Sequence, residues 1–170
     1  MPLWLHLLTH FLLAVLVGLI FWRASKLFWL SLIAAIIGGF LIDVDHLIEY
    51  WIVFHRFSWF GFLNGWQFLW SGKNYLIFHA WEYLPILLLG AFLLRRRQKI
   101  AVFLAVLAAA GFIHLVTDCF INQYSPKFYS LSYRFVYHFS AQDLLPASNL
   151  ELNNYYYQKW FGEMEQEINK

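Results

Sequence analysis

The sequence has few charged residues and a single cysteine. Of its 170 residues, 12 are Lys or Arg and 10 are Asp or Glu, which gives a net charge of only +2. So small a positive charge, without a basic stripe, argues against a nucleic-acid partner, and Cys119 alone excludes an internal disulfide framework. Hydrophobic residues make up 61% of the chain and aromatic residues 22%. A soluble domain of this length could not bury so much apolar side chain, so the composition predicts an integral membrane protein.

Four apolar runs each approach the roughly 20 residues that a membrane-spanning helix needs. They are Leu3–Trp22, Leu27–Ile42, Tyr75–Leu94 and Ile100–Ile121. They predict an all-α fold, an integral membrane four-helix bundle built from residues 1–121. Within it, the aromatic segment 47–74 is expected to lie in the headgroup region, where amphipathic rings are favoured. Residues 122–170 are polar and rich in tyrosine, and we expect a short extramembrane tail packed on the outer face of the bundle.

Basic residues occupy two of the three connections between these runs. Arg23 and Lys26 follow the first run, and Arg95, Arg96, Arg97 and Lys99 follow the third. An antiparallel bundle places these two connections on one side, which the positive-inside rule makes cytoplasmic. The chain is therefore expected in the cell (inner) membrane, with both termini on the outer, periplasmic side.

Each apolar run also contains, or is directly followed by, ionisable residues three or four positions apart. These are His6 and His10, Asp43 and His46 with Asp45 between them, His79 and Glu82, and His114 and Asp118. Residues at these spacings share one face of a helix. All four sets fall toward the outer end of the predicted bundle, so we expect them to converge on one buried cluster.

A mixed set of imidazole and carboxylate groups suits zinc or a similar divalent metal, and so many ligands favour two or more ions. The predicted metal ligands are His10, Asp43, His46, His79, Glu82, His114 and Asp118, with His6 as the weakest candidate. Glu82 and Asp45 are the candidate catalytic carboxylates, which would handle a proton. Arg56 is either an anchor at headgroup level or a phosphate-binding residue.

The motifs resemble those of the YdjM-type membrane-bound metal-dependent hydrolases. An early histidine, a glycine-containing helix that ends in DxDH, a central histidine and a late HxxxD occur in that order, here as His10, Gly38–His46, His79 and His114–Asp118. The central motif of that family is compact, whereas HRF at His55 and FHAWE around His79 are far apart here. The family is distantly similar to zinc phospholipase C and P1 nuclease. This resemblance implies hydrolysis of a phosphoester, with a membrane lipid or a lipid-linked phosphate as the substrate.

Two other functions use the same residues. A non-catalytic membrane metal-binding or transport protein would need polar side chains that continue toward the cytoplasmic end, and the runs offer almost none. A di-iron membrane oxidase would need clustered histidine boxes such as HxxHH, which the sequence lacks. The hydrolase is therefore the first hypothesis, and the binding or transport protein is the alternative.

Overall fold

The computed structural model describes residues 3–169, and the regular elements within that range are all helices, apart from one isolated bridge between Lys73 and Ser140. The chain forms two compact units, each assembled from two separate stretches of sequence. Residues 3–43 and 78–130 form the first unit, and residues 44–77 and 131–169 form the second. The boundary predicted at residue 121 does not coincide with this division, since residues 122–130 belong to the first unit and residues 44–77 do not.

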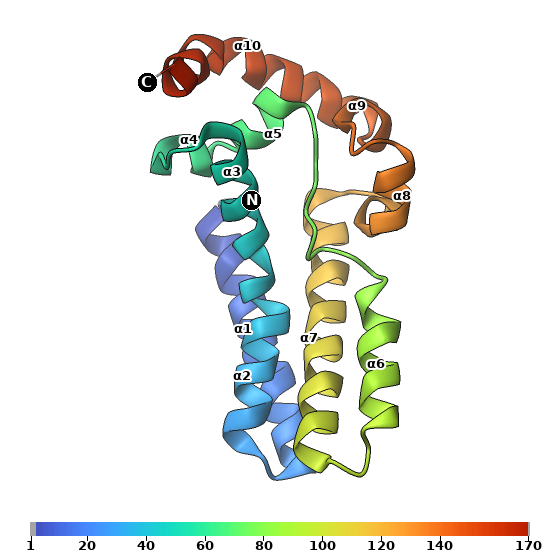
Figure 1. Ribbon diagram of the computed structural model, residues 1–170. Coiled ribbons are helices and arrows are strands. Elements are labelled where there is room, and N and C mark those ends of the chain that lie inside the picture. Colours follow the sequence, from blue (N-terminus) through green and yellow to red (C-terminus); the bar gives the residue numbers. More distant parts are fainter. Residues whose placement is uncertain (1–2, 170) are drawn as a thin grey trace. The chain divides into compact units, whose positions relative to one another are not determined.

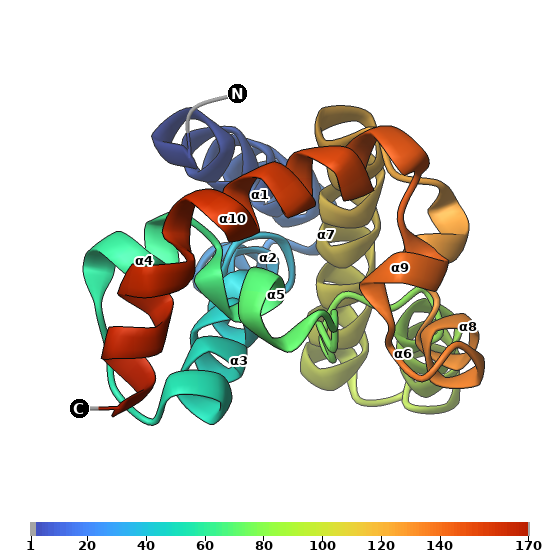
Figure 2. The same cartoon turned by 90° about the horizontal axis from the view of Figure 1, so that it is seen from above.

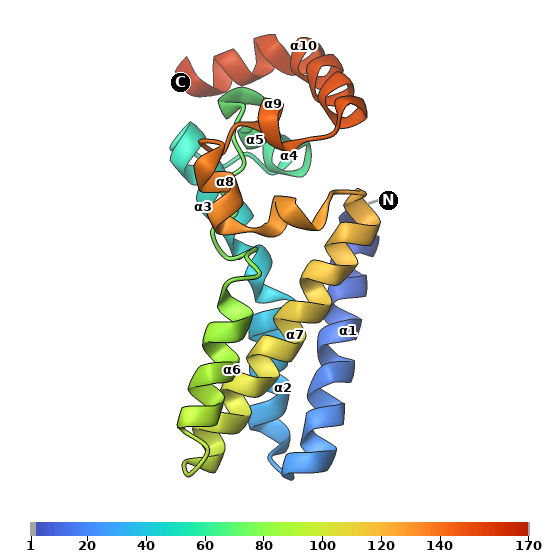
Figure 3. The same ribbon diagram turned by 90° about the vertical axis from the view of Figure 1, so that its right-hand side faces the viewer.

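The first unit is built on four helices that run alongside one another (Figures 1 and 3). They are α1 (Leu3–Ser25), α2 (Phe28–Gly39), α6 (Tyr83–Leu93) and α7 (Gln98–Asn122), with the short 3-10 helices η1 (Leu41–Asp43) and η2 (Pro126–Tyr129). Helix α7 packs against α1, α2 and α6, and α1 also packs against α2. The α1–α2 and α6–α7 connections, which carry the basic residues, lie at the same end of these helices, at the bottom of Figure 1.

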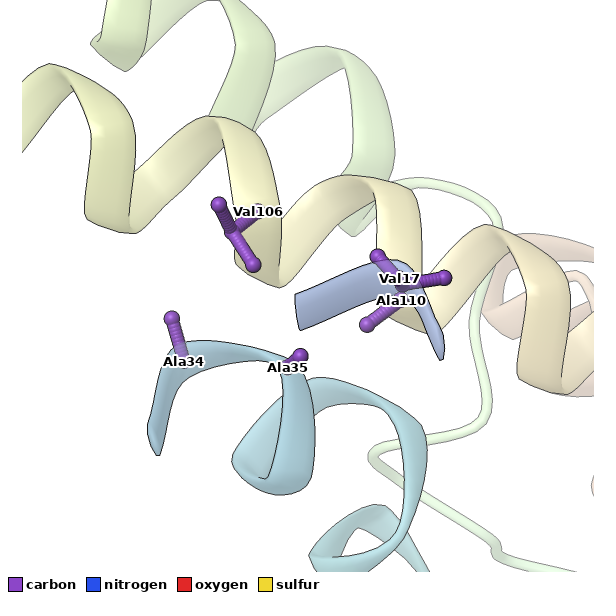
Figure 4. Packing of buried hydrophobic residues seen from close by; sticks show 5 residues of the cluster. All are labelled: Val17, Ala34, Ala35, Val106 and Ala110. Atoms are coloured by element: carbon purple, nitrogen blue, oxygen red, sulfur yellow. The ribbon is translucent and has the colours of Figure 1, made fainter. Parts of the chain in front are cut away.

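Small side chains fill the core where α1, α2 and α7 meet. Val17, Ala34, Ala35, Val106 and Ala110 are buried together (Figure 4). Small residues let helix backbones approach closely, which is how helices commonly associate in membranes. The contact between α1, α2 and α7 is therefore close, because small side chains lie at its centre.

Two glycines bring the end of α2 even closer to its neighbours. A Cβ at Gly38 would lie 2.5 Å from the carbonyl oxygen of Leu107, and one at Gly39 would lie 2.9 Å from the Cβ of Ala14. No larger residue fits at either position without a shift of the helices. The glycine pair thus fixes the approach of α2 to α7 and α1 immediately before Asp43.

Two helices are long and apolar enough to cross a membrane, Leu5–Ser25 within α1 and Gln98–Asn122, which is α7. A third span is added if α2 and the helical stretch Leu41–Phe54 count as one broken span. The outward face of α1 fits this, because Leu12, Leu16 and Ile20 are each more than half exposed. Such a stripe of large apolar side chains is unusual on a surface that faces water.

The third predicted span is much shorter than expected. Helix α6 covers only Tyr83–Leu93, 11 residues, or about 16 Å, against about 30 Å for the hydrocarbon core of a bilayer. Pro85 lies in the first turn of α6, where a missing N–H costs nothing. A helix that began at Tyr75 would instead place Pro85 in its interior, where the ring clashes with the preceding turn. The structure therefore confirms an all-helical chain with two to three candidate spans, and not the complete four-span bundle.

The second unit has an aromatic core. It contains α3 (Val44–Phe54), α4 (Trp59–Leu63), α5 (Trp66–Ser71), α8 (Leu131–Val136), α9 (Ala141–Leu144) and α10 (Ala147–Asn169). Tyr50, Phe54, Trp66 and Met164 are buried together, and α10 packs against α5 (Figure 2). Many of the aromatic residues expected at headgroup level therefore pack against the C-terminal helix, and the tail is a 23-residue helix.

The extended segment between α5 and α6 is held by a buried carboxylate of the second unit. Glu49 on α3 accepts hydrogen bonds from the backbone N–H groups of Tyr75 and Leu76, at 3.0 and 3.3 Å. The fully buried Arg134 of α8 donates to the carbonyl oxygen of Leu76 at 2.9 Å. Glu49 thus serves to fix this segment of backbone.

Candidate metal centre

Six histidine and aspartate side chains of the first unit converge at the end of the helices opposite the basic connections. His6 and His10 are one turn apart on α1, and His114 and Asp118 are one turn apart on α7. Asp43 ends η1, directly after the glycine pair of α2, and His79 lies in the turn region before α6. The structure thus brings together these six of the residues singled out from the sequence.

The first group of ligands joins α1 to α7. The Nε2 atom of His10 lies 2.9 Å from Nε2 of His6 and 3.0 Å from Oδ1 of Asp118. The Nε2 atom of His6 is 3.4 Å from the same oxygen. His10 is fully buried, and its Nδ1 atom has no hydrogen-bond partner. The polar contacts of these two imidazoles are therefore made through the nitrogen that faces the carboxylate.

The second group joins α7 to the segments around η1 and α6. The Nε2 atoms of His79 and His114 are 3.0 Å apart, and they lie 3.2 and 3.5 Å from Oδ1 of Asp43. The same two nitrogens lie 3.6 and 3.3 Å from Oδ2 of Asp118. The two carboxylate oxygens of Asp118 therefore face different groups. Oδ1 faces the His6/His10 group, and Oδ2 faces the His79/His114 group.

The spacing of these atoms suits divalent metal ions. At the bond lengths usual for zinc, about 2.0–2.2 Å to nitrogen or oxygen, two ligand atoms of a tetrahedral ion lie about 3.4 Å apart. The separations within the two groups, from 2.9 to 3.6 Å, fall around that value. Within each group the two imidazoles direct the same nitrogen toward each other. A shared cation accommodates two lone pairs placed in this way, whereas a direct contact between the rings needs a proton on one of them.

The orientation of His114 is fixed by its other ring nitrogen. Nδ1 lies 3.1 Å from the carbonyl oxygen of Gly39, so Nδ1 carries the proton and donates it there. Nε2 is then left with its lone pair toward Asp43 and Asp118. A hydrogen bond that fixes the tautomer of a ligating histidine in this way is usual at metal sites. The glycine pair of α2 thus serves the site as well as the packing.

The prediction that Glu82 and His79 lie on one helix is wrong, because both residues precede α6. Glu82 is the residue before α6, and its Oε1 atom accepts a hydrogen bond from the Ser130 hydroxyl at 2.7 Å. Nearby, the indole N–H of Trp81 donates to the carbonyl oxygen of Pro126 at 2.7 Å, and its backbone N–H donates to that of Tyr129. Glu82 therefore lies where residues 126–130 attach to the start of α6. Its predicted roles as ligand and proton carrier remain predictions.

The other predicted site residues belong to the second unit. Asp45 is buried on α3, and His46 on the same helix places its ring edge-on to Phe68. Arg56 is exposed in the connection between α3 and α4. Their parts in the site remain predictions.

Sequence reasoning gave too little weight to two residues of the site region. His6 was the weakest candidate because it lies near the start of a span, yet it contacts both His10 and Asp118. Tyr129 was assigned to the polar tail, but it is buried in the first unit with its ring 6.4 Å from that of His79. Burial raises the pKa of the Tyr129 hydroxyl well above its usual range, so it remains neutral and accepts a hydrogen bond from Asn122. No spacing in the sequence signals this residue.

No family model, curated protein or solved structure matches the chain. The resemblance to the YdjM-type hydrolases therefore rests on the motifs alone and is carried forward as a hypothesis.

Proposed function

We propose that this protein is a membrane-embedded, metal-dependent hydrolase of a phosphoester. The observation that supports this most is the carboxylate of Asp118, which directs one oxygen to each of two histidine pairs. A single structural ion needs four protein ligands and one closed site. Two ligand groups that share a carboxylate instead suit two ions held close together, as in many enzymes that cleave phosphoesters.

The chain would hold one ion with His6, His10 and Asp118, and the other with His79, His114, Asp43 and Asp118. Bound divalent ions supply a nucleophile at neutral pH, by lowering the pKa of water to about 7, and polarise the phosphoryl oxygen. The fold would fix the positions of the ligand side chains. They come from four places: the pair on α1, the pair on α7, the end of η1 and the turn before α6. Glu82 of the first unit keeps the role proposed for it from the sequence, as a metal ligand or proton carrier.

The membrane setting determines the side on which the site would act. We propose that α1, α2, α6 and α7 form the membrane domain, with the basic connections in the cytoplasm by the positive-inside rule. The ligand cluster lies at the opposite end of the same helices, hence toward the periplasmic side of the inner membrane. A lipid or a lipid-linked phosphate could present its phosphate there while its hydrocarbon part stays in the bilayer.

The alternative is a membrane protein that binds or transports a metal without catalysis. A transport path would need polar groups beyond the cluster, toward the basic connections. The core found there consists of Val17, Ala34, Ala35, Val106 and Ala110, which offers no ligand to a passing ion. That observation favours the hydrolase.

The test is hydrolysis by purified, zinc-loaded protein of a panel of phosphate monoesters and diesters, both water-soluble and lipid-borne. We expect Asp118→Asn to abolish turnover, since the amide removes the charge and one of the two equivalent oxygens. Asp143→Asn is the matched control, because Asp143 is exposed on α9. Stoichiometric metal without hydrolysis of any member of the panel would reject the enzyme and leave the metal-binding protein.

A further inference from the structure

The first unit contains an apolar cavity beside the ligand cluster, open to the protein surface on one side. Its volume is about 440 Å³, and it is walled by residues of α2, η1, α6 and α7 and of the turn before α6. That volume lies within the range of about 300–1,000 Å³ typical of small-molecule sites. Apart from Tyr83, its lining residues carry no polar side chain. The cavity therefore suits a hydrocarbon ligand and not a polar one.

One end of the cavity adjoins the metal ligands. Ile42 precedes Asp43, Phe78 and Ala80 flank His79, and Leu115 follows His114, so the cavity wall includes neighbours of three ligands. The position of the cavity between α2, α6 and α7 was not foreseen from the sequence, and none of its lining residues belongs to the aromatic segment 47–74.

The other end of the cavity extends away from the ligands along the helices. Leu107 on α7, Leu87 on α6 and Ile37 on α2 mark that end, being seven, eight and six residues from the nearest ligand in sequence. From Leu115 to Leu107 the cavity follows α7 for about 12 Å, at about 1.5 Å per residue. Gly38 and Gly111 line it as well, so α2 and α7 present bare backbone on this side.

We propose that this cavity binds one hydrocarbon chain of the substrate while the phosphate lies at the ligand cluster. The inference rests on the proposed function and narrows its substrate class to amphiphiles with an apolar chain next to the phosphate. A polar ligand cluster at one end and a purely apolar wall along the rest match the two parts of such a molecule. The same cavity offers nothing to the sugar or base of a nucleotide.

The proposal predicts a dependence on chain length that specific variants remove. The full-length protein, zinc-loaded and in nanodiscs, is titrated with ethyl, butyl, hexyl and octyl phosphonate, which cannot be hydrolysed. Each added methylene that leaves water for the cavity should tighten binding by up to about fourfold. Leu87→Trp fills the far end and should abolish the gain beyond butyl, with ethyl phosphonate binding unchanged.

Two further variants control for misfolding of Leu87→Trp and for partitioning of the phosphonates into the bilayer. Ile86→Trp also fills the cavity, and Ile86 is 63% exposed, so its replacement disturbs little packing if Leu87→Trp fails to fold. Leu88→Trp is the matched control, because Leu88 is a neighbour on α6 that does not line the cavity. It should keep the full dependence on chain length, including any part that reflects partitioning into the bilayer.

The outcomes separate the two proposals. If affinity rises equally with phosphonate chain length in Leu87→Trp, Ile86→Trp and Leu88→Trp, the proposed site for the hydrocarbon chain is wrong. Binding of the phosphonate group would then still support the proposed function. Failure of every phosphonate to bind zinc-loaded protein would overturn both.

Discussion

Asp118 directs its two carboxylate oxygens to different histidine pairs, at distances from 3.0 to 3.6 Å. The histidines are less equivalent than their number suggests. His6 contacts only the first group, whereas His114 contacts both Asp43 and Asp118 in the second and is oriented by Gly39. Removing them should therefore have different consequences.

We expect His6→Ala to lose about one bound metal ion per chain and His114→Ala to lose the ion of the second group, each retaining the other. Loss of a residue that binds the metal directly usually lowers metal affinity by far more than the 10- to 100-fold seen when a residue hydrogen-bonded to a ligand is lost. Metal content after dialysis, measured by inductively coupled plasma mass spectrometry, checks this. His138→Ala is the control, since His138 is exposed on the second unit. Unchanged metal content in both site variants would contradict the assignment of ligands.

A second prediction at the scale of single residues concerns Gly38, one of the two adjacent glycines at the end of α2. Gly38→Ala would place a Cβ 2.5 Å from the Leu107 carbonyl oxygen, which is backbone and cannot move cheaply. We expect a loss of about 1–3 kcal/mol in the free energy of unfolding, as for other overpacked positions. Gly162→Ala on α10, where nothing lies within 4 Å, should instead stabilise by about 0.5–1 kcal/mol. Thermal unfolding in detergent measures both, and equal shifts would show that α2 does not pack so closely on α7.

Individual elements show where sequence reasoning succeeded and where it failed. Helices α1 and α7 followed from long apolar runs, and the i, i+4 pairs they carry lie on a common face as expected. The helical pair predicted from the HAWE motif, His79 and Glu82, does not form. Pro85 favours a helix that starts at Tyr83, and this leaves His79 outside it. His79 still contacts His114 and Asp118, so its place in the cluster agrees with the prediction although its local structure does not.

The segment that leads from α5 to α6 depends on Glu49. We expect Glu49→Ala to leave the buried N–H groups of Tyr75 and Leu76 without acceptors, at about 1–3 kcal/mol for each. Glu49→Gln should cost less, because the amide keeps one acceptor oxygen. Hydrogen exchange of these two amides is the measurement, with Glu151→Gln on the exposed side of α10 as the control. Protection that persists in Glu49→Ala would show that another group holds the segment.

At the scale of the whole molecule, sequence reasoning predicted an all-helical chain with helices long and apolar enough to cross a membrane, but not its division into two units. The aromatic stretch 47–74 was predicted to be an interfacial segment because amphipathic rings are favoured at headgroup level. Its partner is α10, about a hundred residues later, whose Met164 and Trp160 pack into the Tyr50–Trp66 core. Such pairing of distant segments is not encoded in any local spacing.

The proposed membrane orientation makes a prediction of its own. In a Cys119→Ser background, single cysteines at Arg96 and at the C-terminus should label from opposite sides of intact cells. The basic α6–α7 connection is expected inside and the C-terminus outside, following the distribution of Lys and Arg. Labelling of both positions from the same side would refute four membrane crossings.

The central claim is that the first unit holds two metal ions on ligand groups that share Asp118. Native mass spectrometry of the zinc-loaded protein released from detergent tests this most directly, since it counts the ions on each intact chain. We predict a main species with two zinc ions, and in Asp118→Asn a loss of both, with Asp143→Asn unchanged. A main species with one ion or none, or two ions that persist in Asp118→Asn, would contradict the account.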